Sequence, residues 1–201
     1  MPTFLALGDS YSIGEGVAEA ERWPMQLVAR LRALGIAIDD PHVIARTGWT
    51  TGELSAAMDR ANLHPPYDLV SLLIGVNNQY RNRALGEYRV QFRALLERAV
   101  SLAGGDARHV VVVSIPDWGV TPFARGEGRD PRQVAAQIDA FNATAREEAD
   151  AMRAHFVDIT GSSRAPDVRG LLVGDGLHPS AAQYTRWAKI IAPVAREVLK
   201  T

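Results

Sequence analysis

The sequence predicts an α/β fold in which a five-stranded parallel sheet lies between two layers of helices. Three observations support this fold class. Short apolar runs alternate with segments of helical periodicity along the chain, as in proteins built from βαβ units. The run Leu69–Ile74 is almost continuously apolar, as expected of a strand buried on both faces. No linker, repeat or low-complexity tract interrupts the 201 residues, so we expect one domain over residues 1–201.

The first third of the chain predicts two strands and two helices. A strand over Phe4–Leu7 is followed by a helix over Trp23–Leu34, whose apolar residues share one face and which Gly35 can end. Val43–Ala45 is expected to form the second strand. Thr50, with Glu53 three residues later, has the spacing of a capping box for a helix that runs to about residue 61.

The remaining elements follow the same alternation. Leu69–Ile74 is the third expected strand, and a helix ending at Leu102 precedes the fourth. Asp130 is placed to cap a long helix that Pro131 begins, and Ser180 to cap the last helix, which Pro193 is expected to kink. The last two strands are expected at Val110–Ile115 and Phe156–Ile159.

Composition excludes several classes of protein. The absence of cysteine excludes disulfide scaffolds, cysteine nucleophiles and thiolate metal sites. With 22 basic and 23 acidic residues and no basic block, nucleic-acid binding is not expected. The apolar runs are far shorter than the roughly 20 residues that span a bilayer. The N-terminus lacks the basic region of a signal peptide, so we expect a cytoplasmic location unless a leader was removed.

Chemistry-bearing residues follow the predicted strands, where parallel sheets bind ligands. A serine hydroxyl is a weak nucleophile and needs a base, which in turn needs an orienting acceptor. Of five histidines, only His178 lies at such an edge with an acid, Asp175, three residues before it. Each residue also has an ordinary interpretation, since Ser10 can cap a helix, Gly48 and Asn77 can occupy turns, and Asp175 can cap the turn at His178. Those interpretations do not explain why all five follow strands in this order.

In this order and spacing, Gly8-Asp9-Ser10, Gly48, Gly75-x-Asn77 and Asp175-x-x-His178 resemble the four blocks of the SGNH hydrolases, also called GDSL esterases/lipases. The resemblance covers nearly the whole chain. It implies a three-layer, flavodoxin-like fold with strand order 2-1-3-4-5 and a serine esterase activity that requires no metal and no cofactor.

The resemblance also assigns roles. Ser10 would be the nucleophile and, through its backbone N–H, one donor of the oxyanion hole. The Gly48 N–H and the Asn77 side-chain amide would complete that hole. His178 would act as the base and then as the acid, with Asp175 orienting it.

Two residues depart from the family pattern. Tyr11 stands where the motif has leucine, which is expected to affect the shape of the pocket rather than the chemistry. Asn78 stands where many members have aspartate, so the local hydrogen bonds should differ while Asn77 keeps its role. The Gly-x-Ser-x-Gly motif of the α/β-hydrolase fold is absent.

Substrate choice is expected to rest on the loops that follow the strands. Aromatic residues there could wall an acyl pocket, although packing against the sheet is an equal alternative. The polar segment Gln79–Gly86 is a candidate lid, and three arginines near the same rim could meet an anionic headgroup or coenzyme phosphate or simply be solvated. The aromatic candidates are Trp49, Tyr80, Trp118 and Phe123, and the arginines are Arg46, Arg81 and Arg83.

The sequence therefore predicts a carboxylesterase that cleaves short-to-medium acyl esters of small molecules. Within the same family, a carbohydrate O-acetylesterase and a lysophospholipase or thioesterase are alternatives. An alternative of another class is a non-catalytic, flavodoxin-like module that binds phosphate or nucleotide. Gly14-x-Gly16 lacks the third glycine of a dinucleotide motif, and the first strand-end loop has no Walker lysine. The sequence does not predict the oligomeric state.

Overall fold

A computed structural model describes residues 1–200 of the chain. Its centre is a parallel sheet of five strands in the order β2-β1-β3-β4-β5, which confirms the expected topology. The chain begins in the middle of the sheet, moves to the β2 edge, and then crosses back to build the other half. The strands are β1 (Phe4–Gly8), β2 (His42–Ala45), β3 (Leu69–Leu73), β4 (Val110–Val113) and β5 (His155–Val157).

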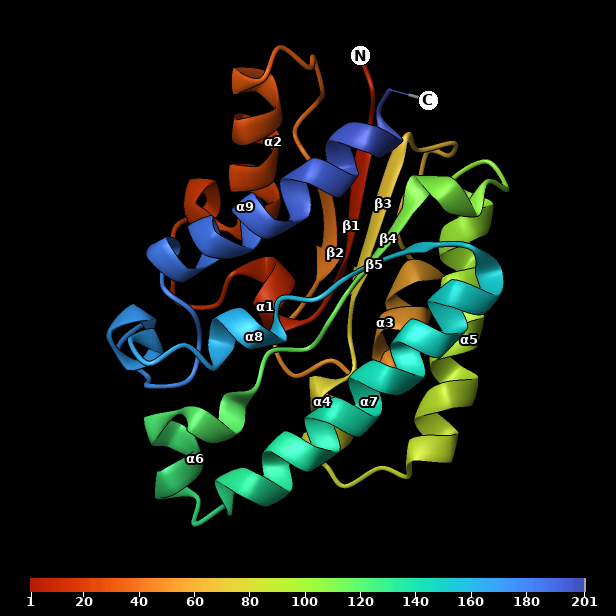
Figure 1. The fold of residues 1–201 in the computed structure, drawn as a ribbon. Helices are drawn as coiled ribbons and strands as arrows, with labels where there is room; N and C mark the ends of the chain where they lie inside the picture. The colour runs from red at the N-terminus through yellow and green to blue at the C-terminus, as the bar shows by residue number, and fades with distance from the viewer. Residues whose placement is uncertain (201) are drawn as a thin grey trace.

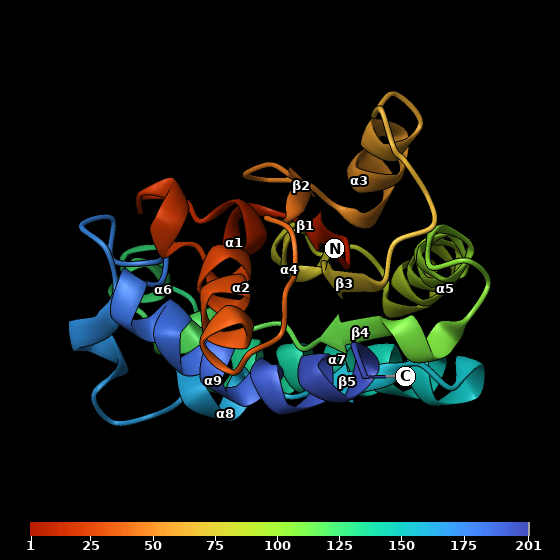
Figure 2. The ribbon, with the colours of Figure 1, turned by 90° about the horizontal axis from the view of Figure 1, so that it is seen from above.

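Helices cover both faces of this sheet. One face carries α2 and α9, and the other carries α3, α5 and α7, as Figures 1 and 2 show from two directions. Four short helices, α1, α4, α6 and α8, gather near the ends of the strands at the bottom of Figure 1. The helices are α1 (Ser10–Ile13), α2 (Trp23–Ala33), α3 (Thr51–Met58), α4 (Val76–Tyr80), α5 (Leu85–Leu102), α6 (Pro122–Gly126), α7 (Pro131–Met152), α8 (Thr160–Ser163) and α9 (Ala181–Val198).

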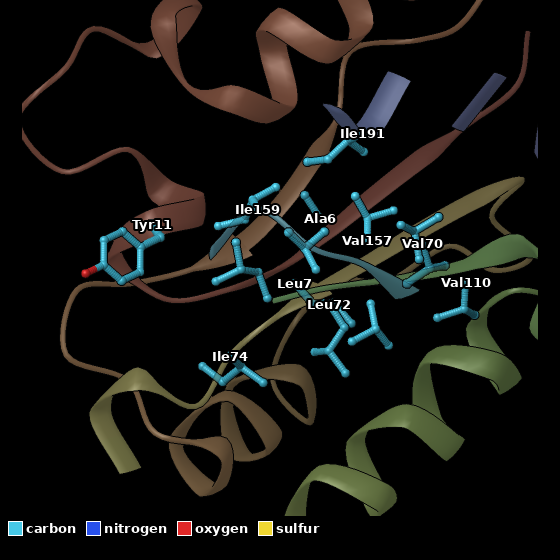
Figure 3. Packing of buried hydrophobic residues seen from close by; sticks show 14 of the residues in the cluster. Ala6, Leu7, Tyr11, Val70, Leu72, Ile74, Val110, Val157, Ile159 and Ile191 are labelled. Atoms are coloured by element: carbon cyan, nitrogen blue, oxygen red, sulfur yellow. The ribbon is translucent and has the colours of Figure 1, made fainter. Parts of the chain in front are cut away.

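The core lies on both faces of the central strands. Leu7 of β1 pairs in register with Leu72 of β3, and both are fully buried. Val70 of β3 and Ile191 of α9 belong to the same cluster (Figure 3). Burying each such side chain contributes about 1.5–3 kcal/mol before the loss of chain entropy is counted. This packing makes the sheet a firm base for the loops that follow its strands.

The helix starts predicted from capping residues are confirmed, with one difference at an N-cap. Thr50 and Glu53 form the capping box of α3, and the Asp130 side chain accepts a hydrogen bond at the start of α7. Ser180 occupies the N-cap position of α9, but its hydroxyl caps nothing. The α9 helix continues through Pro193, which removes one backbone hydrogen bond without ending it.

Element ends and short helices differ most from the sequence prediction. The α3 helix ends at Met58, and β4 and β5 stop at Val113 and Val157, each two or three residues before the predicted end. The segments α1, α4, α6 and α8 have four or five residues each. Such segments are too short to show helical periodicity, yet they occupy the loops that follow the strands.

Candidate active site

Ser10 stands directly beyond β1, as the first residue of α1. The strand ends at Gly8, where an added Cβ would lie 2.7 Å from the Leu73 carbonyl oxygen and closer still to the Ser12 side chain. Only glycine therefore lets β1 pass this close to its neighbours. The chain then turns into α1 at Asp9 and presents Ser10, which is 5% exposed, at the edge of the sheet.

Asp9 is a fully buried acid next to Ser10. Its Oδ1 accepts a hydrogen bond of 3.0 Å from the Tyr11 N–H and so caps α1. Its Oδ2 has no hydrogen-bond partner among residues 1–200. Because burial disfavours the charged form, it raises the pKa of Asp9 to about 7, against the opposing effect of the Tyr11 hydrogen bond.

This raised pKa predicts how stability should change with pH. In the unfolded chain Asp9 loses its proton near pH 4, whereas in the folded protein it keeps the proton to about pH 7. Between these values the folded state binds more protons, so the contribution of Asp9 to the unfolding free energy should fall as pH rises. Asp9→Asn keeps the capping oxygen but does not titrate. In urea unfolding at several pH values, the unfolding free energy of the variant should rise relative to that of the wild type from pH 4 to 7. Parallel plots of unfolding free energy against pH would contradict the expectation.

Asp175 and His178 form a hydrogen-bonded pair in the turn before α9. An isolated bridge between Leu172 and Pro179 closes this turn. The Asp175 Oδ1 accepts from the backbone N–H groups of Leu177 (2.8 Å) and His178 (3.0 Å). Its Oδ2 lies 2.6 Å from His178 Nδ1. The carboxylate thus fixes both the turn and the imidazole, and leaves His178 Nε2 available on the other side of the ring.

Hydrogen bonding outweighs burial at this carboxylate. Partial burial alone would raise the pKa of Asp175, but the hydrogen bonds from the His178 side chain and from two backbone N–H groups hold that pKa below its ordinary value. Asp175 therefore stays ionised at neutral pH. An ionised acceptor at Nδ1 is the partner that a histidine base requires when it gains a proton.

The loop after β2 and the helix after β3 bring Gly48 and Asn77 to the same edge. Gly48 has a φ of +86°, in the left-handed region that favours glycine. Gly75 is more restricted, because its φ is +130° and an added Cβ would lie 2.6 Å from the Tyr88 ring. Gly75 is the N-cap of α4, in which the Asn77 Nδ2 donates to the Trp49 carbonyl oxygen at 2.9 Å. That bond uses one of the two Nδ2 hydrogens of Asn77 and leaves the second available to another acceptor.

One cavity of about 160 Å³ brings together four of the five residues predicted for the triad and the oxyanion hole. Ser10, Gly48, Asn77 and His178 all line it, and Asp175 supports His178 from outside. No hydrogen bond joins Ser10 to His178 in the described chain; such bonds are often long before substrate binds. The cavity is also lined by Tyr11, Thr47, Val76, Tyr80, Trp118, Phe123 and Leu177.

Three of the four predicted aromatic residues form one wall of this cavity. The rings of Tyr80 and Trp118 pack edge to face with their centroids 5.4 Å apart, and the Phe123 and Trp118 ring centroids are 6.2 Å apart. The Arg129 guanidinium stands 5.4 Å from the centre of the Tyr80 ring. Trp118 is fixed further because its Nε1 donates to the buried Gln79 Oε1 at 2.7 Å.

Trp49 does not line the cavity, which differs from the sequence expectation. Its side chain packs against the hydrophobic core, and only its carbonyl takes part in the site by accepting the Asn77 amide. Half of the candidate lid Gln79–Gly86 lies in the ends of α4 and α5, with Gln79 buried, whereas residues 81–84 form an exposed connection between these helices. Sequence reasoning missed Thr47, Val76 and Leu177, each of which adjoins a motif residue in the sequence.

The two departures from the family pattern have visible consequences. The centroid of the Tyr11 ring lies 5.8 Å from that of the His178 ring and 5.9 Å from that of the Trp187 ring. Tyr11 therefore packs between the imidazole and Trp187. The Asn78 Oδ1 accepts from the Thr51 N–H at 3.0 Å while its Nδ2 donates to the Thr51 hydroxyl at 2.7 Å. Asparagine can make this pair of bonds because it both donates and accepts, whereas an ionised aspartate only accepts.

A second, small cavity of about 20 Å³ lies behind the first. Tyr11, Trp118 and Leu177 line both cavities and therefore form the partition between them. Two fully buried atoms of its lining residues, Gln183 Oε1 and Trp187 Nε1, have no hydrogen-bond partner within residues 1–200. The rear cavity is large enough for one water molecule.

Two absences hold for the described part of the chain. Residues 1–200 contain no group of three or more histidine, cysteine, aspartate or glutamate side chains placed to hold a metal ion. Over the same range, no helix has both the length and the apolar character needed to cross a membrane.

Comparison with known proteins gives one family and many structures. The model of the GDSL-like Lipase/Acylhydrolase family matches residues 6–186. No curated protein matches the chain significantly. The structure of TesA resembles this one with a TM-score of 0.77 at 19% identity, covering 98% of this chain and 99% of TesA. The structure of a lipase/acylhydrolase from Enterococcus faecalis has a TM-score of 0.73 at 21% identity, and the match covers 98% of this chain and 96% of that one. The structure of an Axe2 mutant, an acetyl-xylooligosaccharide esterase from Geobacillus, has a TM-score of 0.71 at 20% identity, and the match covers 100% of this chain and 94% of that one.

Proposed function

Because the chain belongs to the GDSL-like Lipase/Acylhydrolase family, and is thus an ester-hydrolysing enzyme, we propose that it cleaves short-to-medium acyl esters through an acyl-enzyme on Ser10. The observation that carries this proposal is the Asp175–His178 pair, joined at 2.6 Å, beside a cavity that also exposes Ser10. Family membership favours this enzymatic reading over a non-catalytic nucleotide-binding module. We also propose that residues 1–201 act as one catalytic domain.

In the acylation step, His178 Nε2 takes the proton of Ser10 as its Oγ attacks the ester carbonyl carbon. The π electron pair of the carbonyl moves onto oxygen, which becomes an oxyanion. The intermediate then collapses, the bond to the alcohol oxygen breaks, and His178 gives its proton to the leaving alkoxide. Asp175 stabilises the imidazolium that exists between these events.

In the deacylation step, water takes the place of the alcohol. His178 removes a proton from water, hydroxide adds to the acyl carbon, and the second intermediate expels Ser10, which regains its proton. Both intermediates carry negative charge on the former carbonyl oxygen. The backbone N–H groups of Ser10 and Gly48, with the Asn77 amide, are the donors that would stabilise it, because they are already oriented before the charge forms.

The aromatic wall supports the choice of acyl group. An apolar cavity of about 150 Å³ accommodates a benzene-sized guest, and this cavity measures about 160 Å³. Tyr80 and Phe123 would contact a chain of only a few carbons before it reached Trp118 in the partition. We therefore place the acyl chain against this wall and the alcohol towards the open mouth.

Trp118→Leu should shift the preferred acyl chain to greater length. The smaller side chain thins the partition and joins the main cavity to the rear one. The ratio of kcat/KM for an octanoyl ester to that for a butanoyl ester should rise by about 10-fold, the usual effect of one or two added methylene contacts. Trp118→Phe keeps a ring in place and serves as the control. An unchanged ratio in Trp118→Leu would remove Trp118 from the acyl site.

The proposed function is tested by a panel of p-nitrophenyl esters of increasing acyl length, with acetylated sugars and acyl-coenzyme A as further arms. We expect the highest kcat/KM among short or medium p-nitrophenyl esters. A fluorophosphonate should label one serine, and peptide mapping should identify it as Ser10. Inactivity on every arm, together with no labelling, would contradict the proposal.

A further inference from the structure

Helix α4 and its C-cap residue, Arg81, donate side-chain hydrogen bonds to two consecutive carbonyl groups of the loop after β2. Asn77 Nδ2 donates to the Trp49 oxygen at 2.9 Å, and Arg81, four residues later, donates through Nη2 to the Gly48 oxygen at 2.6 Å. The second bond is short and charge-assisted, and such bonds are about twice as strong as neutral ones. Together they tie the Gly48 segment to the helix that carries Asn77.

The second terminal nitrogen of the Arg81 guanidinium, Nη1, pairs with a carboxylate of α3. This nitrogen lies 3.3 Å from Glu53 Oε2. That carboxylate also accepts from the Thr50 N–H at 2.8 Å and from the Thr50 hydroxyl at 2.9 Å. The Thr50 N–H bond is the largest influence on the pKa of Glu53, which lies below its ordinary value. Arg81 therefore bridges α4, the Gly48 loop and α3.

Gly48 is a residue whose orientation needs such support. It has a φ of +86°, and glycine rotates more freely about its backbone bonds than any other residue. Among the described residues other than its chain neighbours, a Cβ built on Gly48 would have one atom within 4 Å, the Arg81 Nη2. The Gly48 N–H and carbonyl are separated only by the φ and ψ bonds of Gly48, so a fixed carbonyl restricts where the N–H points.

We propose that Arg81 is a positioning residue for the oxyanion hole, which holds the Gly48 carbonyl so that the Gly48 N–H and the Asn77 amide face one point. The inference rests on the proposed function, because it gives both groups their catalytic task. Arg81 touches no reacting atom in this scheme. A misplacement of about 1 Å in a catalytic group can cost about 10²-fold in rate, so even a partial loss of this restraint should be measurable.

A role in stability alone would leave a different signature. The Arg81 and Glu53 side chains are 41% and 46% exposed, and ion pairs exposed to this degree contribute little to stability. Arg83 provides a matched control, because it is exposed, lies two residues away and makes no side-chain hydrogen bond or ion pair within residues 1–200. Both arginines line the same polar surface pocket.

The experiment compares Arg81→Met with Arg83→Met on one ester substrate. Arg81→Met should lower kcat by about 10-fold or more while KM changes by less than about twofold. The same variant should also react more slowly with a fluorophosphonate, whose adduct places an oxygen in the oxyanion hole. Arg83→Met should match the wild type in all three measurements. An unchanged kcat in Arg81→Met, an effect on KM alone, or an equal loss in Arg83→Met would overturn the proposal.

Two further measurements separate positioning from folding. Adding guanidinium ion at non-denaturing concentration to Arg81→Met should recover part of kcat, and Arg81→Lys should recover part of it without addition. A loss of Tm without any such recovery would overturn the proposal. Failure of the proposed function is distinguished by Ser10→Ala: an active Ser10→Ala enzyme contradicts the function, whereas a normal kcat in Arg81→Met beside an inactive Ser10→Ala contradicts only the role of Arg81.

Discussion

Replacing Ser10 by alanine is expected to lower ester turnover by roughly 10⁴-fold or more. The substitution removes the only atom that can form the proposed acyl-enzyme, and His178 then has no hydroxyl to activate. Labelling by a fluorophosphonate should disappear at the same time. Initial rates with a p-nitrophenyl ester, measured beside the labelling experiment, test both expectations.

Ser12 supplies the matched control for this substitution. It lies in the same short helix, is also buried from solvent, and its hydroxyl has no hydrogen-bond partner among the described residues. Ser12→Ala removes an unsatisfied polar group, so the variant should fold and retain activity. Normal turnover by Ser10→Ala, or a loss in Ser12→Ala as large as that in Ser10→Ala, would refute the assignment of the nucleophile.

Asn77→Ala is expected to lower kcat by about 10²–10³-fold with little change in KM. Losing one donor of an oxyanion hole typically has an effect of this size. The split arises because the charge on the substrate oxygen develops only in the transition state, so the donor adds little to ground-state binding. Steady-state kinetics on the ester that the panel identifies provide the measurement.

Asn77→Asp tests whether donation is the property that matters. The side chain keeps its size and shape, but an ionised carboxylate donates no hydrogen bond to an oxyanion or to the Trp49 carbonyl, which accepts the Asn77 amide in the wild type. This variant should be at least as slow as Asn77→Ala. Activity near that of the wild type in either variant, or an effect confined to KM, would exclude Asn77 from the oxyanion hole.

The expected fold followed from regularities that operate over a few residues. Alternating apolar runs located all five strands, and capping residues such as Thr50 and Asp130 located two helix starts. These signals depend on local backbone chemistry, which the sequence states directly. The ends of elements were less accurate, because the end of α3 at Met58 or of β4 at Val113 depends on what packs beside it.

The aromatic residues show the limit of sequence reasoning at the site. From the sequence, Trp49 and Trp118 were equally good candidates for the acyl pocket, since both follow strands. In the structure Trp118 lines the cavity, where its ring meets Tyr80 and its indole N–H donates to Gln79, whereas the Trp49 side chain does not line it. The direction that a loop side chain takes depends on partners far away in the sequence, and no local pattern reports it.

The sequence by itself determined the fold class, the order of chemistry-bearing residues along the chain, and the absence of any thiol, which is why serine is the expected nucleophile. Only the tertiary structure decided which side chains share a cavity, that Asp9 lies buried with a raised pKa, and that Arg81 holds the Gly48 carbonyl. The physical reason is one of range. Secondary structure and motif spacing follow from nearest neighbours, whereas burial, electrostatic shifts and contacts between loops arise when the sheet brings distant segments together.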